Sequence, residues 1–425
     1  MQPQDDIRAQ HIKRILLVSS NYPRWQGDST TPFIHHLARD LIALGWEVDV
    51  LAPHAPQAAM AEQLDGVTVK RFRYLWPERW ESVCYQGGAL MNLQRNKLNY
   101  LKLPALVLFE WLAIIKCLMR GNYDLLHSHW ILPQGFTGVL AAKLFRVPHV
   151  ITVHGSDAFA LKGRIMEIFK AFTLNNADLV TVNSHATRRQ VQTISRALPE
   201  PQLIPMGISI SSIDPQVQAE LRNRYRIAEG PLLIFVGRLV KQKGAEDMLR
   251  ALAALKYKGI NASLMVVGDG PEYDALRLLA TTLAVAERTH FTGWIAPNSV
   301  ANYMAAADIF VGPSRQTADG ATEAQGLTFI EAMHAGTPVI ATAVGGITDL
   351  VQHEVTGLLV PEASPDDIVS SIERIMADKT LAENMVKQAK ELSQHYTRSH
   401  TAAEFAKQFD ALIQDGYTNK AHHNL

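Results

Sequence analysis

The alternation of short β-branched apolar runs with longer helical stretches is the feature that most limits how this chain can fold. In the first half, such runs occur at residues 15–18, 48–51, 125–127, 149–153 and 179–182. Helical patterns lie between most of them, for example at 33–44 and 135–144. A strand followed by a helix and a second strand builds a parallel sheet, so the sequence predicts the α/β class.

The same alternation starts again in the second half of the chain. Its predicted strands lie at residues 232–236, 263–267, 290–291, 309–311, 338–341 and 357–360. Between the halves lies PEPQLIPMGISISSIDP, whose prolines and glycines favour a linker over a core element. A chain of 425 residues is also too long for one ordinary core. We therefore predict two Rossmann-like, doubly wound domains that face a central crevice, at residues 1–205 and 206–392.

The C-terminal stretch is helical in pattern from 381 to 413, with a break at HYTRSH in its middle. Its polar residues suit a segment that spans two domains. We expect residues 393–425 to form a helix that crosses back to the first domain and ends in a frayed tail, QDGYTNKAHHNL.

Charge and cysteine content exclude several classes of protein. Lysine plus arginine and aspartate plus glutamate both total 41, so no global field attracts nucleic acid or an anionic membrane, and any anion site must be local. Cys84 and Cys117 lie far apart without a partner motif, which indicates a reducing cytoplasm rather than a disulfide framework. The polar start of the chain lacks the layout of a signal peptide. The apolar stretch 103–119, interrupted by Glu110 and Lys116, is shorter than the roughly 20 residues of a spanning helix and predicts a buried helix or a membrane-facing one.

Two cations follow the first predicted strand of the second half, in the string VGRLVKQKG. Gly237 allows a tight turn, and Arg238 and Lys243 come next, at the strand end where such sheets bind ligands. A guanidinium beside an ammonium makes the charge-assisted hydrogen bonds that a diphosphate requires. We interpret this loop as a candidate diphosphate site. The alternative is a solvated loop with two ordinary charges.

The most informative segment is GPSRQTADGATEAQGLTFIEAMHAGTPVIAT. It predicts a loop with Glu323, a helix start at Gly326, Leu327 and Thr328, and Glu331 inside that helix. The first amides of a helix are unpaired and lie at its positive end, so they favour a phosphate. A nucleotide sugar has a hydroxyl-bearing ring on either side of its diphosphate, and the two glutamates would accept hydrogen bonds from the sugar and the ribose. Alternatively, both carboxylates are simply solvated.

Histidines follow two predicted strands of the first half. VPHVITVHGSDAF ends a buried strand at His154, with Asp157 close behind, so both are candidate site residues at the edge of the crevice. A lone histidine is more often structural. DLLHSHWILPQG puts His127, His129 and Trp130 at another strand end, where acceptor contact and plain packing are both open.

The loop after the first predicted strand is a candidate binding site for a phosphate or an acceptor. SSNYPRWQGDSTTPF contains Gly27 and would hold a phosphate or an acceptor, unless its aromatic residues only cap the sheet.

No D-x-D triplet or zinc-type histidine spacing occurs, so we expect no metal. VGDGPEY has Tyr273 where a dinucleotide site needs a third glycine, so we expect no nicotinamide cofactor. Charge on a leaving group would then be stabilised by cations and the helix dipole.

Together these strings resemble glycosyltransferase family 4, a group of retaining GT-B enzymes, over nearly the whole chain. In the family's order come GRLVxxKG at 237–244, VVGDGP at 266–271 and then EAQGLTFIEAMHAGTPVIAT. HGSD at 154–157 resembles the family's segment that reaches over the donor sugar. The combination is specific, although each string alone is not.

The resemblance implies a role for each candidate residue. Arg238 and Lys243 would bind the diphosphate, and Glu331 would hold the ribose. Glu323 would bind hydroxyls of the transferred sugar, and His154 would lie beside the anomeric centre. The leaving phosphate would take the acceptor's proton on the same face, so no general base is assigned. The amides close to the donor would be those of Gly326, Leu327 and Thr328.

Two positions depart from the family pattern. Only Gly27 stands in the first loop, where many members have a glycine pair. Pro205, Met206 and Gly207 stand at the domain crossing, where many have proline-asparagine-glycine. The resemblance therefore carries over neither a glycine-pair contact to phosphate in the first loop nor an asparagine role at the crossing.

The implied activity is a retaining, metal-independent transfer of a hexose-type sugar from a nucleotide-diphosphate sugar. The acceptor would be a glycan, a lipid-linked glycan or a small molecule, in polysaccharide or glycoconjugate biosynthesis. The alternatives are a sugar-nucleotide epimerase or hydrolase, and a non-catalytic nucleotide-sugar-binding partner. KRFRYLWPERW, with the apolar helix after it, would meet a lipid-linked glycan at the inner face of a membrane or pack as a subdomain. The sequence identifies neither the base nor the sugar nor the acceptor.

Overall fold

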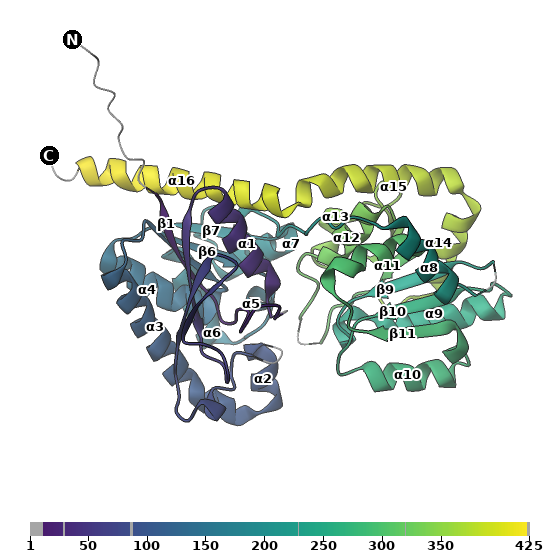
Figure 1. The fold of residues 1–425 in the computed structure, drawn as a ribbon, viewed down its shortest axis with the longest axis horizontal. Helices are drawn as coiled ribbons and strands as arrows, with labels where there is room; N and C mark the ends of the chain where they lie inside the picture. Colours follow the sequence, from purple (N-terminus) through teal and green to yellow (C-terminus); the bar gives the residue numbers. More distant parts are fainter. Residues whose placement is uncertain (1–11, 29, 86–87, 228, 319, 423–425) are drawn as a thin grey trace, which may run out of the picture.

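The protein consists of two α/β domains joined side by side, with one C-terminal helix along the second domain and the last helix along the first (Figure 1). A computed structural model describes residues 12–422 apart from residues 29, 86, 87, 228 and 319. The predicted α/β class with two doubly wound parallel sheets is confirmed.

The first sheet has the strand order β3-β4-β2-β1-β5-β6-β7-β8. Its strands are β1 (Arg14–Val18), β2 (Glu47–Pro53), β3 (Ala61–Leu64), β4 (Val67–Phe72), β5 (Leu125–His129), β6 (His149–Val153), β7 (Leu179–Val182) and β8 (Gln202–Leu203). The helices of this domain are α1 (Pro32–Ala43), α2 (Ala89–Arg95), α3 (Leu103–Arg120), α4 (Phe136–Phe145), α5 (Ser156–Phe159), α6 (Arg164–Asn175) and α7 (His185–Ile194). The strands β1, β2, β5, β6 and β7 are those that the sequence predicts, whereas β8 lies inside the predicted linker.

The hairpin of β3 and β4 was not predicted from the sequence. These strands pair antiparallel through a turn at Asp65 and Gly66, which have φ of 47° and 86°. The Asp-Gly pair is a signal for a tight hairpin turn, because both central residues need positive φ. β4 contains the first residues of KRFRYLWPERW, so this part of the segment lies in the sheet, whereas Trp76 and Trp80 are exposed.

The second sheet has the strand order β11-β10-β9-β12-β13-β14, and its described pairings are parallel. Its strands are β9 (Leu232–Val236), β10 (Ser263–Val267), β11 (Thr289–Gly293), β12 (Ile309–Gly312), β13 (Val339–Thr342) and β14 (Leu358–Val360). Its helices are α8 (Pro215–Tyr225), α9 (Ala245–Tyr257), α10 (Tyr273–Thr282), α11 (Val300–Ala306), α12 (Leu327–Ala335), α13 (Ile347–Leu350), α14 (Pro365–Ala377) and α15 (Lys379–Ser393).

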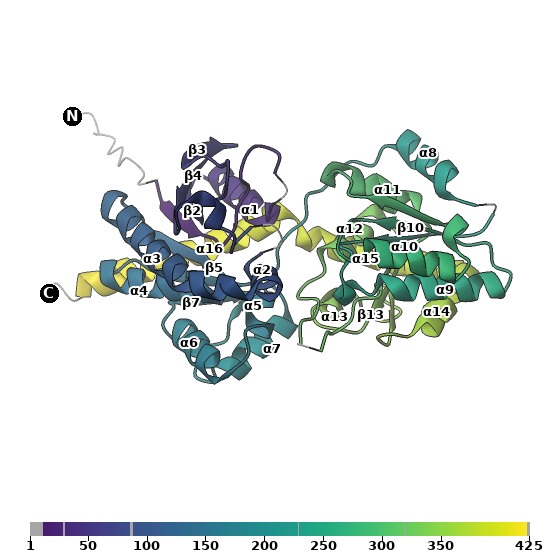
Figure 2. The same cartoon turned by 90° about the horizontal axis from the view of Figure 1, so that it is seen from below.

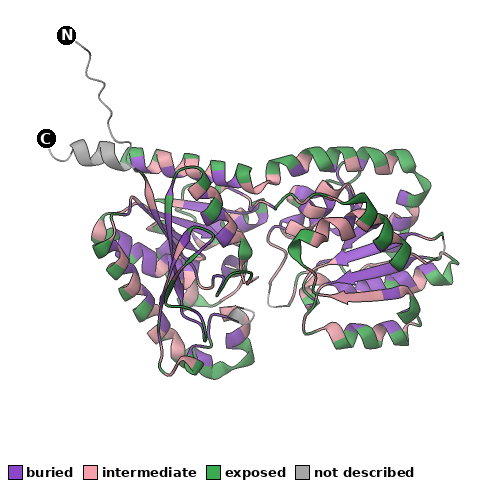
Figure 3. Cartoon of the chain, in the orientation of Figure 1, coloured by how far each residue is buried: buried purple, intermediate pink, exposed green. Residues whose placement is uncertain are grey.

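Both sheets are covered by helices, and the buried residues run along the strands (Figure 3). The strands are near-continuous apolar runs because both faces of a parallel sheet are covered. β9, for example, buries Leu232, Leu233, Ile234 and Phe235 in succession. Leu233 and Phe235 belong to the core on one face, and Leu232 and Ile234 to the core on the other.

The C-terminal helix α16 (Arg398–His422) follows a break after α15 and lies along the first domain (Figure 1). Phe405 and Phe409 are fully buried in the core that also contains Trp46. Arg398 donates to both carboxylate oxygens of Asp40 in α1, at 2.9 and 2.6 Å. The tail that we expected to fray is helical as far as His422, and residues 423–425 lie outside the described residues.

The loops after the strands of one sheet face those of the other. Gly155, after β6, lies against Ala324, after β12, so closely that a Cβ on Gly155 would be 2.3 Å from the Cβ of Ala324. The amide of His185, after β7, donates to Asp349 of α13 at 2.7 Å. The carboxyl ends of both sheets therefore meet between the domains, where open α/β sheets bind ligands.

Candidate active site

The loop after β9 carries the first two predicted cations. Lys243 ends a single 3-10 turn, Lys241–Lys243, and its ammonium contacts the carboxylate of Glu323. Arg238 is exposed and reaches across to the first domain, where its guanidinium contacts the sulfur of Met91 in α2. Partial desolvation of its guanidinium lowers the pKa of Arg238, and the neighbouring Arg95 lowers it further. Two guanidinium groups from different domains thus lie near one another.

The loop between β12 and α12 brings a carboxylate to Lys243. Glu323 lies in this loop, and its backbone carbonyl accepts a hydrogen bond from the amide of Gly346 at 2.8 Å. A Cβ on Gly345 would lie 2.0 Å from the same carbonyl, so only glycine allows this approach. Sequence reasoning missed Gly345 and Gly346, although a paired glycine after a predicted strand is a signal for close backbone contact.

The start of α12 has the character of an anion site. Gly326 precedes the helix with φ of 88°, and no side chain caps the first turn formed by Leu327 and Thr328. The first amides of a helix lack partners within the helix and lie at the positive end of its dipole. The structure thus places this positive helix end directly after the loop of Glu323.

Glu331 lies one turn further along α12 than Leu327, on the same side of the helix. Burial raises the pKa of its carboxyl to about 7. Among the described residues, none forms a hydrogen bond or an ion pair with the side-chain carboxyl of Glu331. A partly protonated, unpaired carboxyl near neutral pH is available to accept hydrogen bonds from a ligand.

His154 follows β6 in the first domain and is bonded to a second histidine. Its Nε2 lies 2.9 Å from Nδ1 of His129, at the end of β5, and the rings stack at an angle of 19°. Burial lowers the pKa of His154 to about 3, so its ring stays neutral near pH 7. Of two neutral rings joined by one hydrogen bond, one must donate and one must accept. Asn183 donates to the backbone carbonyl of His154 at 3.2 Å.

His127, the other histidine of β5, lies in the core of the first domain. His127 is fully buried, bonds the hydroxyl of Thr152 at 2.7 Å and packs against the rings of Phe405 and Phe409. Of the two interpretations that the sequence left open, packing therefore describes His127. Trp130 is half-buried and has its ring centre 5.2 Å from that of His154.

Two of the predicted ligand-binding residues, Asp157 and Gly27, make no described contact with Lys243 or Glu323. Asp157 is buried, and its Oδ2 accepts from the amide of Ile131 at 2.8 Å, while burial raises the pKa of its carboxyl to about 6. This contact holds the turn after His129, while the second carboxyl oxygen, Oδ1, is buried without a hydrogen-bond partner among the described residues. Gly27 lies in an exposed turn with φ of 84°, beside the ion pair of Arg24 and Asp28. The described contacts do not join Gly27 to Lys243 or Glu323.

Gln325 was missed by sequence reasoning although it lies inside the most informative string. Its buried side-chain amide donates to the carbonyl of Met206 at 2.7 Å and accepts from the amide of Met206 at 3.0 Å. The crossing linker is held a second time, because Ile208 pairs with Thr397 in the return crossing before α16. The loop of Glu323 is therefore tied to the domain connection.

Comparison with protein families gives one match in each domain. The model described as Glycosyl transferase 4-like domain matches residues 30–207, and the model described as Glycosyl transferases group 1 matches residues 217–392. Together the two models extend over most of both sheets.

The curated relatives are similar to this chain over different lengths. A GDP-mannose-dependent alpha-(1-6)-phosphatidylinositol monomannoside mannosyltransferase of Mycobacterium tuberculosis is 35% identical over 211 residues, which is 49% of this chain and 55% of that protein. The chain thus spans about half the length of this relative. A D-inositol 3-phosphate glycosyltransferase of Jonesia denitrificans is 27% identical over 401 residues, 88% of each chain.

Solved structures share the fold at low sequence identity. A sucrose-phosphate synthase from Thermosynechococcus elongatus has a TM-score of 0.74 at 24% identity, over 95% of this chain and 100% of that one. An Anabaena protein solved in complex with UDP-glucose has a TM-score of 0.71 at 19% identity, over 94% and 99%. At such identities the likeness concerns the fold alone.

Proposed function

The chain belongs to the glycosyltransferases, with a 4-like domain followed by a group 1 domain in the GT-B arrangement, and from this premise we propose the reaction that it catalyses. It transfers a hexose-type sugar, with retention of configuration, from a nucleotide-diphosphate sugar to an acceptor in polysaccharide or glycoconjugate biosynthesis. The acceptor is a glycan, a lipid-linked glycan or a small molecule.

One observation carries this proposal. Lys243 and Glu323, which lie on loops after different strands, are in direct contact beside the uncapped start of α12. The turn of His154 and Gly155 from the other domain lies against the same loop. A cation for phosphate, a carboxylate for hydroxyls and an imidazole from the opposite side together suit a ligand with both phosphates and sugar rings.

Different residues stabilise the leaving phosphate and bind the hydroxyl groups of the donor. When the bond between the sugar and the diphosphate breaks, negative charge grows on the phosphate oxygen, and Lys243, Arg238 and the start of α12 stabilise it. Glu323 accepts from hydroxyls of the sugar, and Glu331 accepts from those of the ribose. The acceptor oxygen bonds the same face of the sugar carbon and gives its proton to the departing phosphate.

His154 acts as a neutral partner at the reacting sugar. Because its pKa lies at about 3, it brings no positive charge to the donor near pH 7. Its ring therefore contributes a hydrogen bond and shape rather than electrostatic attraction, and its partner His129 holds the ring in place.

No cofactor or metal enters this proposal. The cations and the helix start supply the positive charge that a divalent ion supplies in other transferases, so we expect transfer to continue in excess chelator. Loss of activity on chelation, restored only by a divalent ion, would contradict this part. We place the protein in the cytoplasm or at the inner face of a membrane.

The nucleobase of the donor is the first quantity to measure. Names of similar proteins contain both GDP-mannose and UDP-glucose, so donors with guanine and with uracil are both compared. We expect one of UDP-glucose, GDP-mannose and ADP-glucose to raise the melting temperature, since a ligand at about 100 times its Kd stabilises the fold by about 2.7 kcal/mol.

The products separate the proposal from its alternatives. A new glycoside with the donor's anomeric configuration, observed by proton NMR, supports retaining transfer. Free sugar as the main product with all acceptors would indicate a hydrolase, and an altered sugar still on the nucleotide would indicate an epimerase. Stabilisation without any turnover would indicate a non-catalytic binding partner.

A further inference from the structure

Large apolar side chains are exposed on three neighbouring helices of the first domain. They include Leu108, Phe109 and Leu112 on α3, Leu144 on α4, and Ile165 and Ile168 on α6. Leu144, Ile165 and Ile168 expose 63%, 67% and 61% of their surface. Scattered exposed apolar residues need no explanation, but several on adjacent helices mark a site of interaction. We call the outer surfaces of α3, α4 and α6 the apolar face.

The apolar face is continuous. α4 packs between α3 and α6, and Figure 2 shows the three helices next to one another on the same side of the first sheet. The ring of Phe136 at the start of α4 lies 5.3 Å from that of Phe169 and 5.9 Å from that of Phe172, both on α6. These ring contacts bridge the groove between α4 and α6 with further apolar surface.

The charges on these helices are mainly positive. Lys116 and Arg120 on α3, Lys143 on α4 and Arg164 on α6 are exposed, whereas Glu167 is the exposed carboxylate of the three helices. The remaining one, Glu110, is fully buried. Its oxygens accept from Thr137 at 2.6 Å and Gln134 at 2.8 Å.

This local excess of cations contrasts with the balance of the whole chain, in which 41 basic residues match 41 acidic ones. An apolar surface with basic residues around it is complementary to an anionic lipid surface, whose acyl chains take the apolar groups and whose headgroups attract the cations. Among the described residues, no helix is long and apolar enough to cross a membrane.

We propose that the apolar face docks on the surface of an anionic lipid bilayer, with α3, α4 and α6 lying in the interface. The apolar side chains enter the boundary between headgroups and acyl chains, and Lys116, Arg120, Lys143 and Arg164 contact lipid phosphates. The proposal rests on this face and not on the transfer reaction. It makes the first domain the membrane-bound one and leaves α9 and α10 of the second domain away from the lipid.

The test uses the full-length chain and vesicles, without any sugar donor. We expect co-sedimentation with vesicles of phosphatidylcholine and phosphatidylglycerol, little with phosphatidylcholine alone, and weaker binding at about 1 M salt, where the Debye length falls to about 3 Å. A triple variant, Leu108→Ser with Leu112→Ser and Ile168→Ser, should lower the partition coefficient by about tenfold or more. Lys116→Glu with Arg120→Glu should lower it by about fivefold for each cation removed.

The matched control replaces exposed apolar residues of the second domain instead. Tyr257→Ser with Leu278→Ser, at positions exposed by 95% and 69%, should bind vesicles as the wild type does. Melting temperatures confirm that each variant is folded. For a variant that does not fold, hydrogen exchange of the wild type decides, because vesicles should slow exchange in α3, α4 and α6.

Several results would overturn the proposal. One is a folded wild-type chain that remains in solution with anionic vesicles. Another is a triple variant that binds as well as the control. A third is light scattering that shows a dimer which the triple variant abolishes, since the apolar face would then cover a second copy. None of these results bears on sugar transfer, which is measured separately with donor and acceptor.

Discussion

Lys243 and Glu323 show at the scale of single residues how the proposed site is prepared before a donor arrives. Each side chain is partly exposed, by 23% and 13%, and the two are in contact. A diphosphate beside Lys243 would share its ammonium with Glu323. The ion pair keeps the long lysine side chain in place, so less conformational freedom is lost when the ligand binds.

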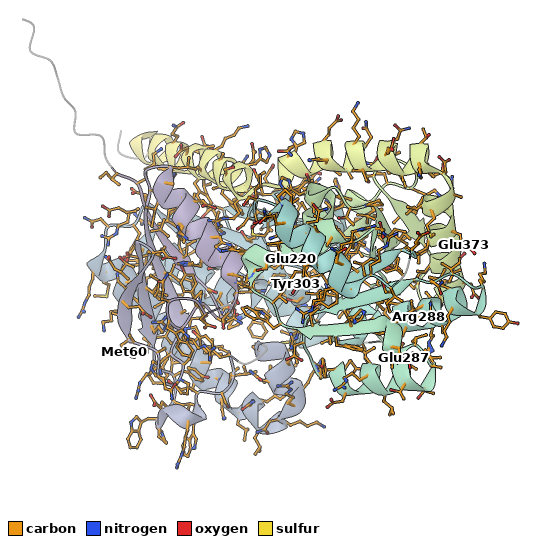
Figure 4. The ribbon with its side chains drawn as sticks, turned by 45° about the vertical axis from the view of Figure 1, so that its right-hand side comes forward. Met60, Glu220, Glu287, Arg288, Tyr303 and Glu373 are labelled. Carbon is orange, nitrogen blue, oxygen red and sulfur yellow. The ribbon has the colours of Figure 1, made fainter. Side chains whose placement is uncertain are left out.

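Substitution of Lys243 tests its role in leaving-group stabilisation. Lys243→Ala should lower kcat by about a hundredfold, the usual effect of losing one group that stabilises developing charge. Lys258→Ala is the matched control, because Lys258 pairs with Glu373 at the outer edge of the second domain (Figure 4). Equal kcat values for the two variants in a steady-state assay would remove Lys243 from the mechanism.

The pH dependence of donor capture tests Glu331. Its pKa is raised to about 7, so the carboxylate that accepts from the ribose is lost as the pH falls below that value. We expect kcat/KM for the donor to fall by up to about tenfold per pH unit below about pH 7, as one protonation requires. His154, with a pKa of about 3, does not titrate in this range.

Glu331→Gln supplies the comparison for that profile. The amide cannot ionise, so the variant should have a lower kcat/KM that no longer changes with pH in this range. A wild-type profile that is flat below pH 7, or a variant with the same slope as the wild type, would speak against the ribose assignment.

At the scale of elements, α16 belongs to the core of the first domain although it follows the second in sequence. Phe405 and Phe409 are fully buried there, and the ring of Phe409 lies 5.9 Å from that of Trp46. The return crossing before α16 pairs with the outgoing linker, as Ile208 and Thr397 show. The chain therefore crosses between the two domains twice, once in the linker and once before α16.

Phe409→Ala tests the contribution of α16 to the first domain. Removal of a buried ring should lower the free energy of unfolding by about 3–5 kcal/mol. Lys407→Ala, at an exposed position of the same helix, should change it by less than about 0.5 kcal/mol. Urea unfolding measures both, and similar midpoints for the two variants would show that α16 contributes little to this core.

At the scale of the whole molecule, buried titratable groups connect stability to pH. Burial lowers the pKa of a set of imidazoles, so the unfolded chain takes up protons near pH 6.5 that the folded chain does not. The free energy of unfolding therefore decreases as pH falls below about 6.5. Burial lowers the pKa of His149 and His154 to about 3 and that of His36 to about 4, and it places the pKa values of His127 and His129 well below the ordinary value.

Three buried carboxyl groups act in the opposite direction. Glu110 and Glu331 have pKa values of about 7 and Asp157 of about 6, so the folded chain holds these protons at a pH where the unfolded chain has released them. Their contribution to stability is lost as pH rises through these values. Because the histidines are more numerous, the melting temperature without ligand should rise between about pH 5 and pH 7 and change little just above that range.

Scanning calorimetry across that range measures the dependence. His149→Leu removes one of the titrating imidazoles at a position away from the proposed donor site, so its melting temperature should fall less steeply with acid than that of the wild type. A melting temperature that is higher at pH 5 than at pH 6.5 would contradict this account of the buried histidines.

The repeating pattern of strands and helices, and the strings that carry charge at strand ends, could be read from the sequence. Periodicity depends on local backbone geometry, so the predicted strands and the helix after Gly326 were found within a few residues. The β3–β4 hairpin was not predicted, because β3 has few β-branched residues. The Asp65-Gly66 turn was nevertheless a usable signal.

By itself, the sequence determined that the chain forms two α/β domains and which loops carry the candidate cations, carboxylates and imidazole. Only the tertiary structure decided that Lys243 meets Glu323, that His129 bonds His154, and that Gln325 holds the linker at Met206. It also decided which apolar residues of α3, α4 and α6 remain uncovered. The physical reason is that strand and helix formation depend on neighbours in sequence, whereas these contacts depend on how two whole domains pack, which no local pattern encodes.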